Sequence, residues 1–367
     1  MSGMERRTFL KGLGLAAAIP LFGASLASCS AASRNRGSNG DADSIVVVDS
    51  GGEYSDAAKQ AFYDPFTEAT GIRVQPTPYE STGTLMRQLA QSPGNYDVLS
   101  NAPLGAVTMQ AEGLLAPIDY SLLGQFSDMN DLPEDGRGEF HVDSNYWASV
   151  MAYRTDVFDG SLVPQTWQDF WDADTFQGPR SMQSDISPIE YEFALIADGV
   201  AADPKELYPI DIDRALQSLD GIAPHISTFW ASGALSTQAL AQREVVLTTI
   251  WNGRAQGLID EGAPVAISWN GAMRRSNAWM IPNGSEKVEA AHQFIDFTAN
   301  PERQAEFAQL TGYGPTNETA YDFIDEETAI KLPSNPDWVD EGFAFNSEWW
   351  AENEAQANEA WSRWATQ

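Results

Sequence analysis

Residues 44–74 read SIVVVDSGGEYSDAAKQAFYDPFTEATGIRV, and this stretch decides the fold class. Ile45–Val48 is a short β-branched run and predicts a buried strand. Asp56–Thr70 has the pattern of a helix that ends at Gly71, and Ile72–Val74 predicts a second strand. A strand, a helix and a second strand in this order are typical of a parallel sheet covered by helices.

The same alternation recurs along the chain. Further strands are predicted at Tyr96–Leu99, Val245–Ile250, Val265–Trp269 and Ser276–Pro282, and further helices at Thr82–Gln91, Pro103–Gly113, Thr166–Trp171, Glu286–Ala299 and Glu348–Trp364. Thr166 and Asp169 are spaced as in a capping box. In the fourth of these helices Val288, Ala291, Phe294, Ile295 and Thr298 share one face. The pattern predicts an α/β fold with a parallel sheet and helices on both faces.

The globular part, residues 44–367, exceeds the usual size of a single hydrophobic core, which suggests two domains. We expect one lobe from residues 44–151 and 278–316 and the other from 152–277 and 317–367. Hinge crossings near Ala152, Asn277 and Thr316 would join them. A small ligand is expected in the cleft between the lobes, beyond the carboxyl ends of the strands.

The N-terminus has the pattern of an export signal. Arg6 and Arg7 precede a hydrophobic residue and a lysine, and an apolar run follows from Gly12 to Ala27. Paired arginines before a short apolar segment indicate a twin-arginine signal peptide, which we place at residues 1–28. A membrane-spanning helix is the weaker interpretation, because such a helix needs roughly 20 apolar residues.

Cys29 follows Leu26-Ala27-Ser28, and this sequence resembles a lipobox. The resemblance implies cleavage before Cys29 and lipid attachment to its sulfur; the alternative is an incidental cysteine beside an ordinary cleavage site. Residues 29–43 are otherwise small and polar and predict a flexible tether. We therefore expect an exported protein held by lipid at the outer face of the cytoplasmic membrane or in the periplasm.

The net charge of the chain is −31, with Lys and Arg together numbering 21 against 52 Asp and Glu. The acids are scattered among apolar residues, which indicates a solvated surface of the halophilic type rather than a disordered chain. A melting temperature that stays flat or falls between low and molar salt would contradict this interpretation. Nucleic acid is not an expected partner, because phosphate binding needs clustered cations. We expect a monomer.

Several motifs, in a characteristic order and spacing, are similar to those of one protein family. They are FTEATGIRV at 66–74, YES at 79–81, PQTWQDFW at 164–171, IWNG at 250–253, AWMIP at 278–282, AAHQFIDF at 290–297 and GYGPTN at 312–317. Together they resemble the extracellular solute-binding proteins of ABC importers, of the spermidine/putrescine-binding type. The resemblance implies a two-lobed periplasmic-binding-protein fold, type II-like, that closes on a hinge and passes a small polar solute to membrane permease subunits.

Candidate ligand-binding residues come from the strand ends and from the resemblance. Tyr54 and Trp251 each follow a predicted strand and could offer a ring face to a cation, or pack in the core. Glu80 and Ser81 could face the cleft or cap the next helix. The resemblance implies second-lobe carboxylates near Asp185 and Glu190, with Tyr191 beside them. Trp230 could cover the ligand.

One departure from the family pattern concerns the charge of the ligand. Where the family has an aromatic residue and then an aspartate that pairs with an amine, this chain has Arg275 and Asn277. A buried arginine would repel a polyamine but can hold a carboxylate through two hydrogen bonds. A one-residue slip in the alignment, or an arginine folded onto a surface acid, would remove this argument. A polyamine and a carboxylate-bearing solute both remain candidates.

Catalysis has little support in the sequence. The three histidines, His141, His225 and His292, lie far apart, and no nucleophile or phosphate-binding motif is present. An exported hydrolase remains a remote alternative, since acidic pairs are too numerous to exclude by count. A ferric-iron site is not favoured, because no two tyrosines are adjacent. We expect a binding protein without cofactor or metal.

Overall fold

The strand–helix–strand unit predicted at the start of the globular part is present in the computed structural model, which describes residues 44–160, 162–183 and 190–366. Strand β1 (Ser44–Asp49) is parallel to β2 (Arg73–Pro78). A continuous helical segment joins them, made of α1 (Gly52–Ala58), one π-helical turn and α2 (Asp64–Thr70). Gly71 ends α2 with φ 77°, a left-handed conformation that glycine adopts without strain.

The remaining elements follow the predicted alternation. The helices are α3 (Thr82–Gln91), α4 (Pro103–Ala111), α5 (Trp167–Trp171), α6 (Tyr191–Ala197), α7 (Pro204–Leu207), α8 (Ile212–Ile222), α9 (Gly233–Ala241), α10 (Asn252–Asp260), α11 (Val288–Thr298), α12 (Pro301–Thr311), α13 (Glu326–Ala329), α14 (Pro336–Glu341) and α15 (Ser347–Trp364). The strands are β3 (Val98–Asn101), β4 (Leu115–Ala116), β5 (Val142–Arg154), β6 (Arg180–Gln183), β7 (Ile226–Trp230), β8 (Leu247–Trp251), β9 (Val265–Pro282) and β10 (Phe343–Ala344).

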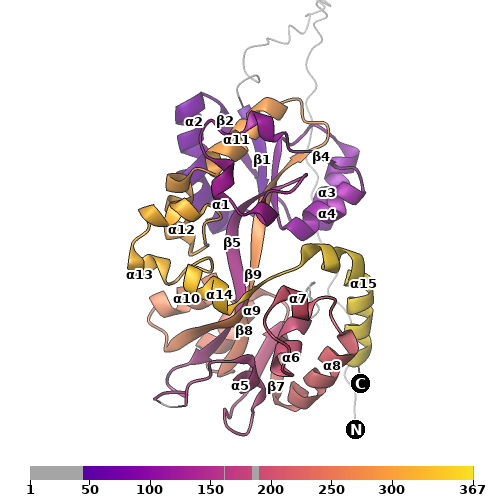
Figure 1. The fold of residues 1–367 in the computed structure, drawn as a ribbon, viewed down its shortest axis with the longest axis vertical. Helices are drawn as coiled ribbons and strands as arrows, with labels where there is room; N and C mark the ends of the chain where they lie inside the picture. The colour runs from indigo at the N-terminus through magenta and orange to yellow at the C-terminus, as the bar shows by residue number, and fades with distance from the viewer. Residues whose placement is uncertain (1–43, 161, 184–189, 367) are drawn as a thin grey trace, which may run out of the picture. The chain divides into compact units, whose positions relative to one another are not determined.

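The sheet confirms the α/β class but is mixed rather than wholly parallel. Its order is β2-β1-β3-β9-β5-β8-β6-β7. The parallel groups at the two ends match the prediction, whereas β9 and β5 run antiparallel to each other through the middle. Figure 1 shows these two long strands passing from the part that holds β1 and β2 to the part that holds β7 and β8.

Strand β9 is longer than predicted. The sequence predicts two strands, Val265–Trp269 and Ser276–Pro282, but β9 runs unbroken from Val265 to Pro282. Gly271 lies inside it with φ 67°, and a Cβ there would come within 2.8 Å of the Trp167 ring. The same glycine's carbonyl accepts a hydrogen bond from Trp167 Nε1 at 2.8 Å. Glycine at 271 therefore allows β9 to continue from one half of the protein to the other, with the strand backbone packed against the Trp167 indole.

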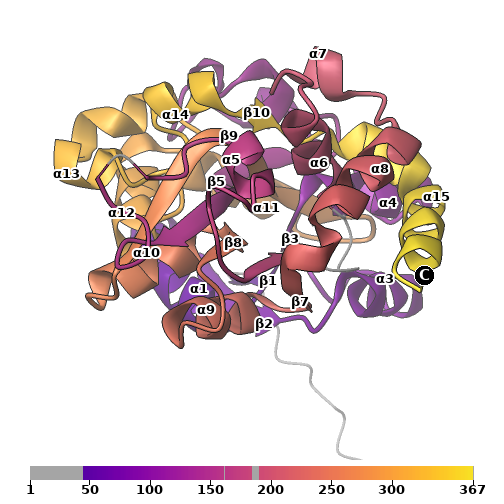
Figure 2. The same ribbon diagram turned by 90° about the horizontal axis from the view of Figure 1, so that it is seen from below.

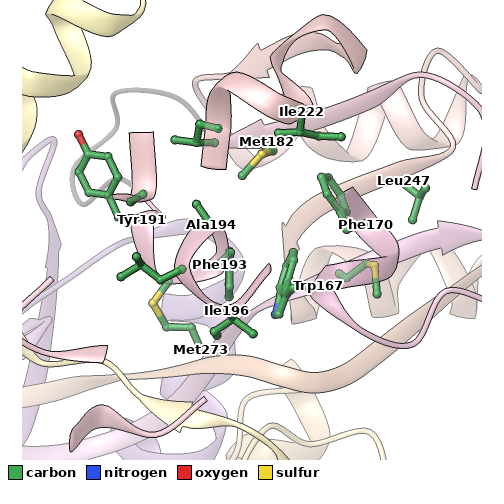
Figure 3. Close-up of a cluster of buried hydrophobic side chains, with 14 of the residues drawn as sticks. Trp167, Phe170, Met182, Tyr191, Phe193, Ala194, Ile196, Ile222, Leu247 and Met273 are labelled. Carbon is green, nitrogen blue, oxygen red and sulfur yellow. The ribbon is translucent and has the colours of Figure 1, made fainter. Parts of the chain in front are cut away.

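Separate hydrophobic clusters fill the two ends of the sheet. One contains Phe66, Trp279 and Phe294, which meet edge to face at centroid distances of 5.3 Å. Another contains Trp167 stacked on Phe193 at 3.8 Å, and Figure 3 shows these rings packed among the other apolar side chains of the cluster. Two cores at opposite ends of long shared strands are what a two-lobed protein requires.

Local signals in the sequence are largely confirmed. The capping box at the start of α5 is complete: Asp169 N–H donates to Thr166 Oγ1 at 3.2 Å, and Thr166 N–H donates to Asp169 Oδ2 at 2.9 Å. In α11 the predicted apolar face is buried except for Val288, which is 38% exposed at the first residue of the helix. None of the described helices is both long and apolar enough to cross a bilayer.

The C-terminal helix α15 connects the two ends of the molecule. It packs against α4, which follows β3 at one end of the sheet, and against α8 at the other end. Figure 2 shows α15 running beside both helices. Trp350 and Trp361 on α15 are buried in the same cluster as Trp167.

Candidate ligand-binding cleft

A cavity of about 890 Å³ lies where the two halves meet over the crossing strands. Its walls come from the beginnings of α3 and α4 on one side, and from the ends of β6 and β8 and the start of α15 on the other. Its floor is formed by β5 and β9, which present both charged and aromatic side chains. The predicted residues Trp251 and Arg275 line this cavity.

Arg275 is the most constrained cation of the cavity. Its guanidinium carbon lies 4.4 Å from the centre of the Phe345 ring and 5.2 Å from that of Trp147, so the plane is held between two aromatic side chains. Strand pairing places it there, because Arg275 is opposite Trp147 in the β5–β9 register. The side chain is only 9% exposed.

The hydrogen-bonding capacity of Arg275 is largely unused. Its Nη2 reaches only the sulfur of Met273, at 3.7 Å, and its Nε has no hydrogen-bond partner within the described ranges. No ion pair joins it to a carboxylate of these residues. A buried guanidinium without a paired anion is costly unless a ligand supplies one.

Two buried acids, Glu190 and Glu192, interact electrostatically with Arg275 but are too far from it to form an ion pair. Burial raises the pKa of Glu190 to about 7, and the charge of Arg275 opposes this shift. Burial likewise raises the pKa of Glu192, whose Oε1 accepts hydrogen bonds from Tyr208 Oη at 2.6 Å and Trp350 Nε1 at 2.8 Å. A pKa of about 7 leaves Glu190 partly ionised at neutral pH, and both acids oppose the lowering of the Arg275 pKa by burial without forming an ion pair with it in the described part of the chain.

A second charged position lies further along the floor, at Asp143 on β5. This carboxyl is 7% exposed, and its Oδ1 accepts no hydrogen bond from any described residue. His141 Nε2 approaches Oδ1 only to 3.8 Å. Burial raises the pKa of Asp143 to about 8; a hydrogen bond from Ser276 opposes the shift and the charge of Asp135 adds to it. Within the described residues, the cavity therefore combines an arginine without an ion pair and a buried carboxyl group whose Oδ1 has no hydrogen-bond partner.

Trp251 and Trp230 form one aromatic unit beside the cavity. Trp251 lines it, meets Trp147 edge to face at 5.9 Å, and has an indole Nε1 without a partner among the residues the structure describes. Trp230 lies behind, 5.8 Å from Trp251, and is 1% exposed, with its Nε1 donating to the Thr249 carbonyl. Trp230 thus supports Trp251 rather than covering the cavity.

Tyr54 and Asn277 lie in a buried polar cluster next to the crossing strands. The Tyr54 hydroxyl is 3.3 Å from Ser100 Oγ and 3.4 Å from Asn145 Oδ1. Ser144 Oγ donates to the Asn277 carbonyl at 3.0 Å, and Asn145 pairs with Asn277 in the β5–β9 register. Burial raises the pKa of Tyr54, so the phenol is neutral. Neither Tyr54 nor Asn277 lines the cavity wall, and their contact with a solute stays a prediction.

The other predicted residues have structural contacts of their own. Ser81 caps α3 by accepting a hydrogen bond from Thr84 N–H at 3.2 Å, and Glu80 beside it is exposed. Tyr191 is fully buried and donates to the Ala357 carbonyl of α15 at 2.8 Å. Asp185 lies outside the described residues, as do Arg6, Arg7 and Cys29.

The sequence and fold of this chain are similar to those of known proteins. The family model of the bacterial extracellular solute-binding proteins matches residues 61–337. The chain belongs to this family. It is 28% identical over 328 residues to the gamma-aminobutyric acid-binding protein of Pseudomonas aeruginosa, covering 88% of this chain and 91% of that protein.

Two further relatives define the role of this solute-binding protein. An ABC transporter substrate-binding protein from Bradyrhizobium japonicum is 32% identical, with a TM-score of 0.80 over 88% of this chain and 98% of the other. The spermidine/putrescine-binding periplasmic protein of Escherichia coli is 27% identical over 284 residues, covering 75% of this chain and 79% of that protein. The chain is thus a substrate-binding protein of an ABC importer and delivers a small solute to a membrane permease; the prediction of a binding protein rather than an enzyme is confirmed by its family.

Proposed function

We propose that this solute-binding protein captures a zwitterionic solute, an amino acid with separated charges, and holds its carboxylate on Arg275. The observation that carries the proposal is the buried guanidinium between Trp147 and Phe345, which forms no ion pair with a described carboxylate. A solute carboxylate would supply that anion through two parallel hydrogen bonds. The relationship to a gamma-aminobutyric acid-binding protein supports the same solute class.

A polyamine, expected from the family resemblance, is the second candidate. It is favoured by the buried carboxyl groups of Asp143 and Glu190 and by the relationship to a spermidine/putrescine-binding protein. An ammonium group close to Arg275 would, however, meet a like charge in a site of low dielectric, which is strongly unfavourable. The arginine therefore favours a solute that carries a carboxylate over a polyamine.

We propose that the two lobes close on the solute when it is captured. One predicted lobe comprises residues 44–151 and 278–316, and the other comprises residues 152–277 and 317–367. The cavity supports this, because its walls come from both ends of the sheet while β5 and β9 join those ends beneath it. A solute that contacts both walls stabilises the closed form, since only that form makes both sets of contacts.

The solute class is tested by calorimetric titration of the exported protein with gamma-aminobutyric acid (GABA), β-alanine, putrescine and spermidine at equal ionic strength. We expect at least one of the two amino acids to bind about tenfold or more tightly than either amine, because only an amino acid pairs with Arg275. Tighter binding of putrescine or spermidine would contradict the proposal and support the polyamine. Absence of binding by all four would exclude both short solute classes.

Anchoring is proposed from the sequence around Cys29, with export through the signal that contains Arg6 and Arg7. Cys29→Ala is expected to move the protein from the membrane fraction to the soluble exported fraction, because the sulfur that carries the lipid is lost. Fractionation followed by a carbonate wash measures this. A mutant that stays with the membrane would contradict lipid anchoring, and export that survives replacement of both arginines by lysine would point to another route.

A further inference from the structure

We propose that Asp143 binds the ammonium group of the solute, so that Asp143 and Arg275 together select an amino acid whose two charges are several carbons apart. This inference rests on the proposed function, because it assigns the second end of a solute whose carboxylate is held by Arg275. It adds a specificity-determining residue that neither the sequence motifs nor the resemblance indicates.

The spacing of the two charged positions follows from the strand register. Asp143 is opposite Ala278 and Trp147 is opposite Arg275 in the antiparallel β5–β9 pair. Three to four residues at roughly 3.3 Å per residue separate the two positions, or about 10–13 Å along the strands. Both residues line the same cavity. The Arg275 and Asp143 side chains cover part of this distance. An α-amino acid carries both charged groups on one carbon and is too short to bridge the remainder, whereas an ω-amino acid has a chain that can extend between the two side chains.

Among the described residues, no cation lies within hydrogen-bond distance of the Asp143 carboxyl group. Burial lowers the pKa of His141, so its ring is neutral and compensates little of the carboxylate charge. Arg274 on the adjacent strand lies over the Tyr146 ring at 5.2 Å; its charge lowers the pKa of Asp143, but no ion pair joins the two side chains in the described part of the chain. The other titratable groups interacting with this carboxyl are Asp135, Tyr120 and Tyr146, none of which is a cation. A solute ammonium group is the partner that would complete the site.

Binding of an ammonium group then has a measurable consequence for protons. Because the pKa of Asp143 is raised to about 8, the carboxyl group holds its proton at pH 7 in the solute-free protein. An ammonium group stabilises the ionised form, so the proton leaves to the solvent when the solute binds. Affinity for an amino acid should fall about tenfold per pH unit below pH 8, whereas affinity for a carboxylic acid without an amine should lack this dependence.

The experiment compares GABA with butyrate, which lacks the amine, by calorimetry at pH 7 in two buffers of different ionisation enthalpy. Wild type is expected to prefer GABA by about tenfold or more and to release close to one proton with GABA only. Asp143→Asn should reduce the preference to below about threefold and abolish proton release, while butyrate binding stays within about threefold. Glu134→Gln is the control, since Glu134 is an exposed acid in the turn that precedes β5.

The outcomes separate this inference from the proposed function. If Asp143→Asn retains both the preference for GABA and the proton release, Asp143 does not bind the amine, even where Arg275 holds the carboxylate. If wild type binds neither GABA nor butyrate, the proposed function itself fails. Should the variant not fold, the series glycine, β-alanine, GABA and 5-aminovalerate on wild type decides: affinity should rise from glycine to GABA, and a flat or falling series overturns the proposal.

Discussion

Replacement of Arg275 by alanine is expected to weaken GABA binding by about 10- to 150-fold. The guanidinium is buried between Trp147 and Phe345, so a carboxylate bound to it forms charge-assisted hydrogen bonds away from water. Loss of such bonds costs about 1.5–3 kcal/mol, which corresponds to this range of affinity. Arg275→Lys should retain part of the affinity, because an ammonium group keeps the charge but not the planar pair of donors. Calorimetric titration measures both variants.

The control for Arg275→Ala is Arg214→Ala, which removes the same charge from a surface ion pair with Asp198 that does not line the cavity. That variant should bind GABA as wild type does, since exposed pairs contribute little and lie in high dielectric. An Arg275→Ala protein that folds and binds GABA unchanged would contradict the assignment of the carboxylate site. Unchanged GABA binding combined with tighter binding of putrescine would show that the arginine only excludes amines, whereas tighter putrescine binding with weakened GABA binding agrees with the assignment.

Replacement of Asp296 by alanine is expected to lower the free energy of unfolding by about 3–5 kcal/mol, the largest stability effect we predict. Asp296 is fully buried on α11. Its carboxylate accepts hydrogen bonds from the N–H groups of Gly124, Gln125 and Phe126 and from Ser127 Oγ, at 2.7–3.0 Å. Removing the acceptor leaves four donors of one loop without a partner, at a cost that grows with their burial.

Chemical denaturation measures this change, with Asp322→Asn as the control because Asp322 is exposed. The control should stay within about 0.5 kcal/mol of wild type. A loss of less than about 1 kcal/mol in Asp296→Ala would mean that water or a relaxed loop satisfies the donors. The outcome depends only on the free energy of unfolding and not on GABA affinity.

The fold class could be predicted because its signals are local. The β-branched run of β1, the glycine that ends α2 and the capping box at Thr166 each act within a few residues, and each is present as predicted. The mixed sheet could not be predicted from the sequence, because β5 contains polar residues from Asp143 to Asn145 that interrupt the apolar pattern of a buried strand. Those residues are polar because they lie beside the cleft and its buried polar cluster.

The site was predictable to a lesser degree than the fold. Arg275 and Trp251 were found from motif order, and both line the cavity. Asp143, Trp147 and Phe345 were missed, because they meet Arg275 or its cavity only through cross-strand register and the return of the chain at β10. The polar and aromatic run from Asp143 to Trp147 was the available signal, since several such residues in a long strand favour a ligand-facing surface over a core.

A crystal structure of the protein with GABA tests the central claim most directly. We expect a solute between the two halves, with its carboxylate oxygens at about 2.7–2.9 Å from the Arg275 guanidinium, between Trp147 and Phe345. A solute whose ammonium group occupies that position, or one bound without any contact to Arg275, would contradict it.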